Sequence, residues 1–159
     1  MTEALLIYGA GAHARKVCQA WTLAGGRVEA FIDDNPLAVS PVPGIELRAL
    51  AALERPPAGA ALFVAIGNAE ARRRLVELHA RQGWKLPVVV HPRASIAPDA
   101  QLDEGVFVGA GAVIESAARI GRGAIVDIGA LVDHDARVEA FAHLRAGTVC
   151  TAGQYFRQS

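Results

Sequence analysis

A six-residue repeat fills the second half of the chain. From Ile96 to Tyr155, ten hexads follow one another without an insertion, and the fifth hexad position is Ala, Val or Thr in nine of them. The ten opening residues are Ile96, Leu102, Val108, Ile114, Ile120, Val126, Val132, Val138, Leu144 and Cys150. Helices show apolar spacing near 3.6 and strands show alternation, so this period predicts a solenoid of short strands and turns. Three hexads would close an 18-residue triangular coil with the aliphatic side chains stacked inside.

Glycine marks a corner of the predicted coil. It occupies the fourth hexad position in six repeats, where a tight turn needs the positive φ that glycine tolerates. Two hexads in the middle depart from this rule. One has Asp135 at this position, directly after His134, and the next has Phe141, two residues before His143. Departures from local rules occur most often at functional sites, so these two hexads are the candidates for chemistry.

Apolar runs alternate with amphipathic stretches in the first half of the chain. Strands are predicted at 4–8, 28–32, 61–66 and 87–90, helices at 15–23 and 69–82, and a short strand followed by a short helix at 45–53. This alternation predicts a parallel sheet with ligands bound beyond the carboxyl ends of its strands. We therefore expect an α/β domain over residues 1–91 and a solenoid domain over 92–159.

The second predicted helix carries both leucines and arginines. Asn68 is expected to cap its N-terminus, Leu75 and Leu78 to face inward, and its arginines to face water. His79 and His91 show no partner pattern in the sequence. We expect them at the surface or at the domain boundary.

The turn after the first predicted strand has the sequence Gly9-Ala10-Gly11-Ala12-His13-Ala14, which matches the Rossmann fingerprint G-x-G-x-x-[GA]. Glycines there let the backbone approach a phosphate, and the following helix supplies free N–H groups. Asp33-Asp34 ends the second strand, where an acid that binds ribose is expected. A turn without a ligand is one alternative. A nicotinamide-dependent oxidoreductase is another, but four strands make only half of a dinucleotide-binding fold.

These motifs resemble the bacterial nucleotide-sugar acetyltransferases, which include the UDP-4-amino-sugar N-acetyltransferases and the sialic acid O-acetyltransferases. The resemblance rests on Val132-Asp133-His134-Asp135, on Glu139-Ala140-Phe141-Ala142-His143 and on the glycine turn. It implies an N-terminal Rossmann-like parallel sheet followed by a left-handed parallel β-helix that is shortened at the C-terminus. The left hand follows only from the resemblance, because crossovers in general are right-handed.

The resemblance also implies an activity, an assembly and site residues. The chain would be an acetyl-CoA-dependent acetyltransferase of a UDP-activated amino sugar in surface glycan biosynthesis, and a homotrimer with the acyl-CoA groove between subunits. His134 would be the general base, which suits the near-neutral pKa of histidine, and Asp135 would orient the imidazole and raise its basicity. His143 would contact the acetyl-CoA thioester. The UDP-sugar would lie against Gly11, Ala12, His13, Lys16, Asp33, Asp34 and Gly67. Ala12 departs from the Gly-Gly-His that is usual in the family.

The end of the chain leaves a second function open. After Gly153 the hexads are expected to end, whereas the family continues for two or more coils that hold CoA. The alternative to an enzyme is therefore a nucleotide-sugar-binding module whose catalysis is weak or lost. The sequence does not decide between N- and O-acetylation or identify the sugar.

Composition excludes several classes of partner. The charges of the 16 basic and 16 acidic residues cancel. The chain therefore lacks the surplus of basic residues that is typical of nucleic-acid-binding proteins. No apolar run is long enough for a membrane span, which predicts a cytoplasmic protein with no membrane insertion. Cys18 and Cys150 are expected to be small core residues. No metal site is expected, because no third His or Cys shares a coil with the two histidines.

Overall fold

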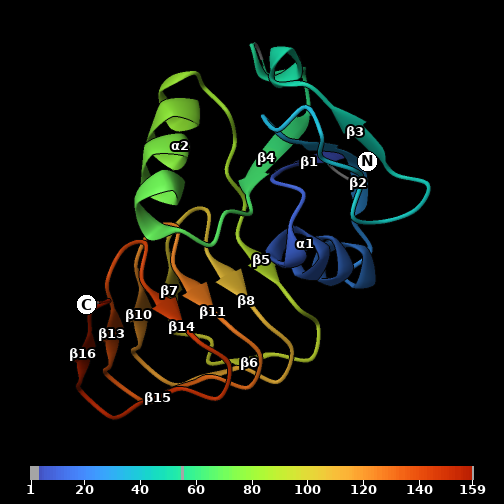
Figure 1. Ribbon diagram of the computed structural model, residues 1–159. Helices are drawn as coiled ribbons and strands as arrows, with labels where there is room; N and C mark the ends of the chain where they lie inside the picture. Colours follow the sequence, from blue (N-terminus) through green and yellow to red (C-terminus); the bar gives the residue numbers. More distant parts are fainter. Residues whose placement is uncertain (1–3, 55, 159) are drawn as a thin grey trace. The chain divides into compact units, whose positions relative to one another are not determined.

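The computed structural model describes residues 4–54 and 56–158 (Figure 1). The chain divides into two compact units, the first ending at Pro87 and the second beginning at Val88. The first unit carries the glycine turn and the second carries the hexads.

The first unit is a parallel sheet of four strands, as its alternating sequence predicts. The strands are β1 (Ala4–Tyr8), β2 (Arg27–Ile32), β3 (Glu46–Arg48) and β4 (Ala60–Val64). Their order in the sheet is β3-β2-β1-β4, so the strand order reverses between β1 and β4. This reversal is the switch point at which open α/β sheets bind ligands.

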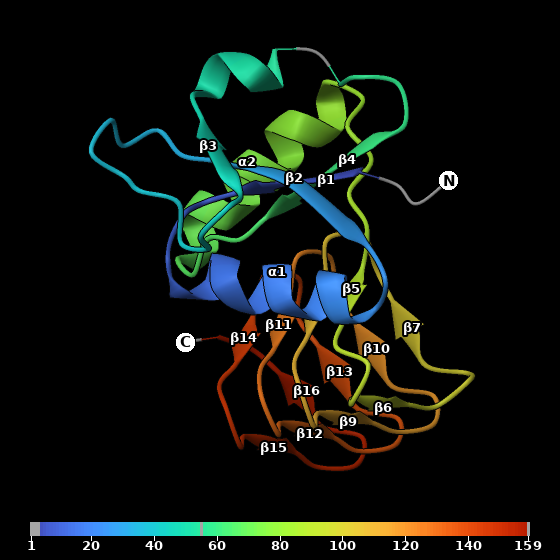
Figure 2. The same ribbon diagram turned by 90° about the vertical axis from the view of Figure 1, so that its right-hand side faces the viewer.

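Helices cover both faces of this sheet. The helices are α1 (Ala12–Leu23), α2 (Ala69–Arg81) and the 3-10 helix η1 (Leu50–Leu53). Figure 2 shows α1 on one face and α2 on the other. The short strand and short helix predicted at 45–53 are confirmed as β3 and η1. The predicted cap of α2 is also confirmed, because Asn68 Oδ1 accepts a hydrogen bond of 2.9 Å from the N–H of Ala71.

The predicted orientation of α2 is correct only in part: Arg73, Arg74 and Arg81 are exposed as expected, and Leu75 is half-buried. The buried residues of the helix are Arg72, Val76 and His79, whereas Leu78 is 40% exposed. The ring of His79 lies 5.8 Å from the ring of Tyr8, and its Nδ1 is 2.8 Å from Gln82 Oε1. The surface position expected for His79 is therefore wrong as well. A spacing of four and three residues along the helix places the three buried side chains on one face.

The second unit is a β-helix with three parallel sheets of four strands each. It is consistent with the left-handed kind that the resemblance implies. One sheet contains β7 (Gln101–Leu102), β10 (Arg119–Ile120), β13 (Arg137–Val138) and β16 (Tyr155–Phe156); the second β5 (Val89–Val90), β8 (Phe107–Val108), β11 (Ile125–Val126) and β14 (His143–Leu144); and the third β6 (Ser95–Ile96), β9 (Val113–Ile114), β12 (Leu131–Val132) and β15 (Val149–Cys150). The paired strands lie one coil apart in the sequence.

The core of the β-helix has the predicted composition. Opening aliphatic residues such as Ile114 and Val132 stack with fifth-position alanines such as Ala118 and Ala136, and all four are at most 1% exposed. Cys150 belongs to this core, and Cys18 is buried in the first unit. Burial of this apolar surface, at about 25 cal/mol per Å², is the main favourable contribution to the folding of the solenoid.

The solenoid extends beyond the predicted repeat at both ends. The sequence predicts Val89–Val90 as part of the last strand of the first sheet, but this segment pairs with β8 and begins the β-helix. His91 follows it and is buried, which excludes the surface position and leaves the other expected place, near the domain boundary. At the other end, the hexads do not stop at Gly153, because Tyr155–Phe156 pairs in register with β13 as one further strand. The chain divides into the two units after Pro87, whereas the sequence predicts the domain boundary after residue 91.

No helix in the described part of the chain has the length and apolar character needed to cross a bilayer.

Candidate functional site

The loops after β1 and β4, where the sequence predicts the nucleotide site, follow neighbouring strands of the first unit. Gly9 has φ +110°, and a Cβ there would lie 2.9 Å from the carbonyl oxygen of Ala65. The N–H of Ala65 donates to Tyr8 O at 2.8 Å. Only glycine therefore fits at the start of the first loop, and the two loops are in contact at the switch point of the sheet.

Gly11 and Gly67 differ from Gly9 because nothing in the chain requires glycine at either position. Gly11 has φ −89°, Gly67 also lies outside the left-handed region, and no atom of the described residues is within 4 Å of the Cβ that either would carry. Both glycines end their loops at the predicted nucleotide site. The open space in front of each is room for a ligand to approach the backbone.

The two predicted acids have different surroundings. Asp33 Oδ2 accepts the N–H of Ala10, and its Oδ1 accepts the N–H of Asn35, each at 2.9 Å. Asp33 therefore fixes the glycine turn against the end of β2. Asp34 is exposed and lies next to it. Of the two carboxylates, Asp33 already accepts two backbone hydrogen bonds, whereas Asp34 is open to solvent.

The remaining predicted ligands of the nucleotide lie on the first turn of α1. Gly11 is the N-cap, Ala12 is exposed, and His13 and Lys16 are half-buried. The structure thus brings Gly11, Ala12, His13, Lys16, Asp33, Asp34 and Gly67 to the carboxyl edge of one sheet. Their contact with a nucleotide stays a prediction.

The histidine and the carboxylate predicted to act together in the second unit are in contact. His134 Nδ1 lies 2.8 Å from Asp135 Oδ2, and both side chains are more than half exposed. If Nδ1 donates to the carboxylate, Nε2 bears the lone pair and faces solvent as a base must. The hydrogen bond that Asp135 accepts from the ring, aided by the charge of Asp133, raises the pKa of His134 above its ordinary value.

The backbone explains how two neighbouring residues make this contact. Asp135 has φ +59°, so the chain turns sharply at the corner between β12 and β13, and the two side chains no longer point to opposite sides. Positive φ at the fourth hexad position also occurs outside the glycine hexads and the two hexads that contain Asp135 and Phe141. Ala117, one coil earlier, has φ +57°, and Asp99 supports its turn by accepting from Ser116 Oγ at 2.7 Å.

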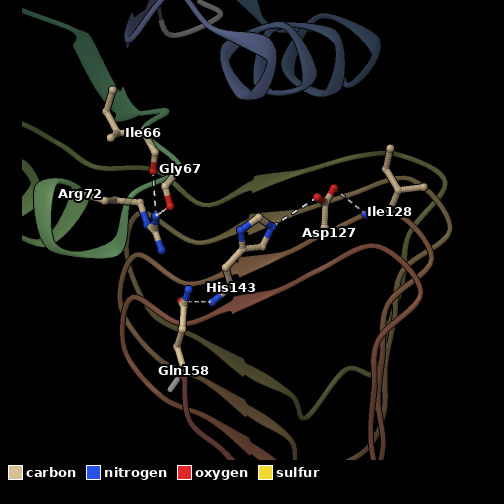
Figure 3. Close-up of polar contacts among 7 residues, drawn as sticks. All are labelled: Ile66, Gly67, Arg72, Asp127, Ile128, His143 and Gln158. Carbon is tan, nitrogen blue, oxygen red and sulfur yellow. Dashed lines mark hydrogen bonds and ion pairs between the residues drawn. The ribbon is translucent and has the colours of Figure 1, made fainter.

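A second histidine–carboxylate contact lies on another sheet of the β-helix. His143 Nε2 is 3.3 Å from Asp127 Oδ2, and both side chains are largely buried (Figure 3). Asp127 Oδ1 also accepts the N–H of Ile128, and the N–H of His143 donates to Gln158 Oε1 at 3.0 Å. The ring of His143 is therefore held in one orientation. No local motif marks Asp127 as a partner of His143, although the coil period brings residues about 16 to 18 positions apart together.

A hollow of about 740 Å³ lies along the sheet formed by β7, β10, β13 and β16, and Asp135 is one of its walls. Arg119 and Arg137 are register partners on adjacent strands and both line it, together with the acids Asp103 and Glu139. No motif in the sequence marks this hollow. The coil register would have shown it, because the two arginines are one coil apart.

No group of three or more His, Cys, Asp or Glu side chains within residues 4–54 and 56–158 is arranged to hold a metal ion. The arrangement of His134 and Asp135 is suited to proton transfer, because the carboxylate orients the ring and the free nitrogen is accessible.

Comparisons with known proteins bear on the family and the fold. The family model described as the PglD N-terminal domain matches residues 4–78. Perosamine N-acetyltransferase from Caulobacter crescentus, solved as a histidine-to-asparagine variant with CoA and GDP-perosamine, is 34% identical with a TM-score of 0.85, and the match covers 96% of this chain and 73% of that one. No match is found among curated protein sequences.

Two further structures are similar. The acetyltransferase domain of PglB from Neisseria gonorrhoeae FA1090, solved with acetyl coenzyme A, is 28% identical with a TM-score of 0.83, and the match covers 98% of this chain and 88% of that one. WeeI from Acinetobacter baumannii AYE is 23% identical with a TM-score of 0.75 over 94% of this chain and 73% of its own, and it supports the fold alone. With this fold and the identity to perosamine N-acetyltransferase, the chain belongs to the sugar N-acetyltransferases of the hexapeptide β-helix type.

Proposed function

We propose that the chain is an acetyl-CoA-dependent N-acetyltransferase that acts on an amino group of a nucleotide-activated sugar. The observation that carries this proposal is the contact of 2.8 Å between His134 Nδ1 and Asp135 Oδ2, which leaves Nε2 toward solvent. Two similar proteins were solved with CoA or acetyl coenzyme A, and one of them also with GDP-perosamine. His134 is the base and Asp135 its orienting partner.

The reaction forms a C–N bond and breaks a C–S bond. The neutral amine of the sugar attacks the thioester carbonyl, and His134 Nε2 removes the proton from the nitrogen as the bond forms. The CoA sulfur leaves and takes the proton from the imidazolium, which regenerates the base. The Asp135 carboxylate stabilises the imidazolium by its hydrogen bond to Nδ1.

We propose UDP as the nucleotide, held by the first unit. Support comes from the resemblance of the turn Gly11-Ala12-His13 and of Asp33-Asp34 to the UDP-4-amino-sugar enzymes. A turnover assay with acetyl-CoA and either UDP- or GDP-linked 4-amino sugars tests the activity and the nucleotide together. Acetylation of neither sugar, together with tight binding of one of them, would favour the alternative, a binding module without efficient catalysis.

We also propose a homotrimer with the acyl-CoA groove between subunits. Val113, Leu131 and Val149 are register partners on the outer side of one β-helix sheet, and Val149 is 56% exposed. An apolar column of this kind suits contact with another subunit. Light scattering on the purified protein would give the subunit number, and a monomer would exclude this assembly.

Replacing Gly67 or Gly11 by alanine is expected to weaken nucleotide-sugar binding roughly tenfold or more without loss of stability. Neither position requires positive φ, and no atom in the described part of the chain meets the added methyl group, so we expect a bound ligand to be what collides with it. Calorimetric titration with UDP-sugar measures the binding, and thermal melting measures the stability. Gly83→Ala is the control: its φ of +85° makes the change destabilising, but binding should persist. Unchanged affinity in both the Gly67 and the Gly11 variant would place the nucleotide elsewhere.

Replacing His143 by alanine is expected to raise the KM for acetyl-CoA roughly tenfold, the value of one good hydrogen bond, while the affinity for the nucleotide sugar stays the same. The ring is fixed by Asp127, so Asp127→Asn should raise the same KM by a smaller factor. Steady-state kinetics with each substrate varied in turn separates the two effects. An increase in the KM for the sugar alone would remove His143 from the coenzyme site.

A further inference from the structure

Arg72 is a buried cation beside the predicted nucleotide site. It lies in the first turns of α2 and is 1% exposed. Its Nη1 donates to two consecutive carbonyls, Ile66 O at 2.7 Å and Gly67 O at 2.8 Å (Figure 3). Desolvation lowers its pKa to about 10, so the guanidinium remains charged at neutral pH. Burying such a charge is costly, which makes the loop carbonyls that it binds essential to its position.

The geometry of the peptide unit gives these two hydrogen bonds a consequence. In a planar trans peptide, the C=O and the N–H point in opposite directions. With the carbonyls of Ile66 and Gly67 turned toward Arg72, the N–H groups of Gly67 and Asn68 point away from it. Among the described residues, neither N–H donates to any acceptor. Within residues 4–54 and 56–158, the space in front of Gly67 is also open, since no atom lies within 4 Å of the Cβ it lacks.

We propose that Arg72 is a positioning residue that presents the N–H groups of Gly67 and Asn68 to the diphosphate of the nucleotide sugar. The inference rests on the proposed function and assigns the β4 loop to the phosphates. Two adjacent N–H donors suit phosphate oxygens, which accept several hydrogen bonds at once. The positive charge of Arg72 lies behind the same peptide groups and favours an anion in front of them.

The direct test removes one N–H without changing any charge. Asn68 has φ −64°, which proline adopts without strain, so Asn68→Pro deletes the N–H and the side-chain cap together. Asn68→Ala is the matched control, because it loses only the cap. The readout is the affinity of UDP relative to uridine, or of GDP relative to guanosine if the chain selects guanine. We expect this ratio to fall roughly tenfold in Asn68→Pro relative to Asn68→Ala, and an equal ratio in the two variants would overturn the role of this N–H.

Variants of Arg72 test the same inference independently. Arg72→Met should lower the ratio of diphosphate to nucleoside affinity by roughly tenfold or more, and Arg72→Lys should restore part of it by keeping the charge and a donor. The KM for acetyl-CoA should not change in either variant. A purely structural role would weaken nucleoside and diphosphate by the same factor, and that result in Arg72→Met or Arg72→Lys overturns the inference. If the unmodified protein binds no nucleoside diphosphate at all, the proposed function fails instead.

Discussion

Replacing His134 by alanine is expected to lower kcat by a factor on the order of 10²–10⁴, which is the usual contribution of a positioned acid–base residue. The affinity for the nucleotide sugar should stay nearly the same, because the side chain belongs to the β-helix and the proposed nucleotide site to the first unit. The side chain is exposed and buries no core surface, so the variant should fold normally. Single-turnover kinetics with saturating substrates measures the chemical step.

The pH dependence of kcat gives a second test of the same residue. The hydrogen bond that Asp135 accepts from His134 Nδ1 raises the pKa of His134, and the imidazole accepts a proton only in its neutral form. Activity should therefore fall as the pH drops through that raised value. Asp135→Asn removes the carboxylate, so the fall should move to lower pH while the plateau decreases, because the base is weaker and less firmly oriented. Full kcat in His134→Ala between about pH 6 and 8, the range in which histidine titrates, would place the base elsewhere.

The repeat is the most informative part of the sequence because its period maps directly onto the coil. Each turn of three hexads places the same hexad position in the same column, so the core and the glycine corners follow from the sequence alone. The period does not predict the first strand of the solenoid, even though Val90 fits the opening hexad position and Ala94 fits the fifth. Pro87 and Pro92 interrupt the sequence there, and the hexad has Arg93 where most repeats have glycine.

The first unit shows where periodicity stops being informative. Leu75 and Leu78 suggest an inward face for α2, but the buried face carries Arg72 and His79. A scale that treats arginine as polar cannot predict its burial, because the compensating partners are carbonyl groups of a loop that the sequence does not place. The edge of the sheet that carries the proposed nucleotide ligands is easier to predict, since the ends of parallel strands share one edge whatever the orientation of the helices.

The contact between His134 and Asp135 is predictable for a related reason. Neighbouring residues can meet only where the chain turns, and a hexad repeat shows where its corners are. The partner of His143 is harder to find, because Asp127 comes from the previous coil and from a hexad with an ordinary corner glycine, Gly129. Local departures from the repeat thus indicate contacts within one corner, whereas contacts between coils require the register.

Truncating Phe141 is expected to lower the free energy of unfolding by more than any of the site substitutions above. Its side chain is buried, and its ring lies over Gly123 in the neighbouring coil, where an added Cβ would come within 2.5 Å of Phe141 Cε1. Phe141→Ala should cost about 3–5 kcal/mol, the usual range for deleting a buried aromatic ring. Thermal or urea unfolding of the purified variant measures this loss.

The backbone makes glycine the milder replacement at this position. Phe141 has φ +63°, a conformation that costs a residue with a Cβ about 1–2 kcal/mol and glycine almost nothing. Phe141→Gly should therefore be less destabilising than Phe141→Ala by about 1 kcal/mol, which reverses the order normally seen in a strand. Gly123→Ala supplies the matched test, because the collision with the ring disappears once the ring is removed. In the Phe141→Gly background the cost of Gly123→Ala should fall to that of its own φ of +62°, and strictly additive free energies of unfolding would show that the ring does not rest on Gly123.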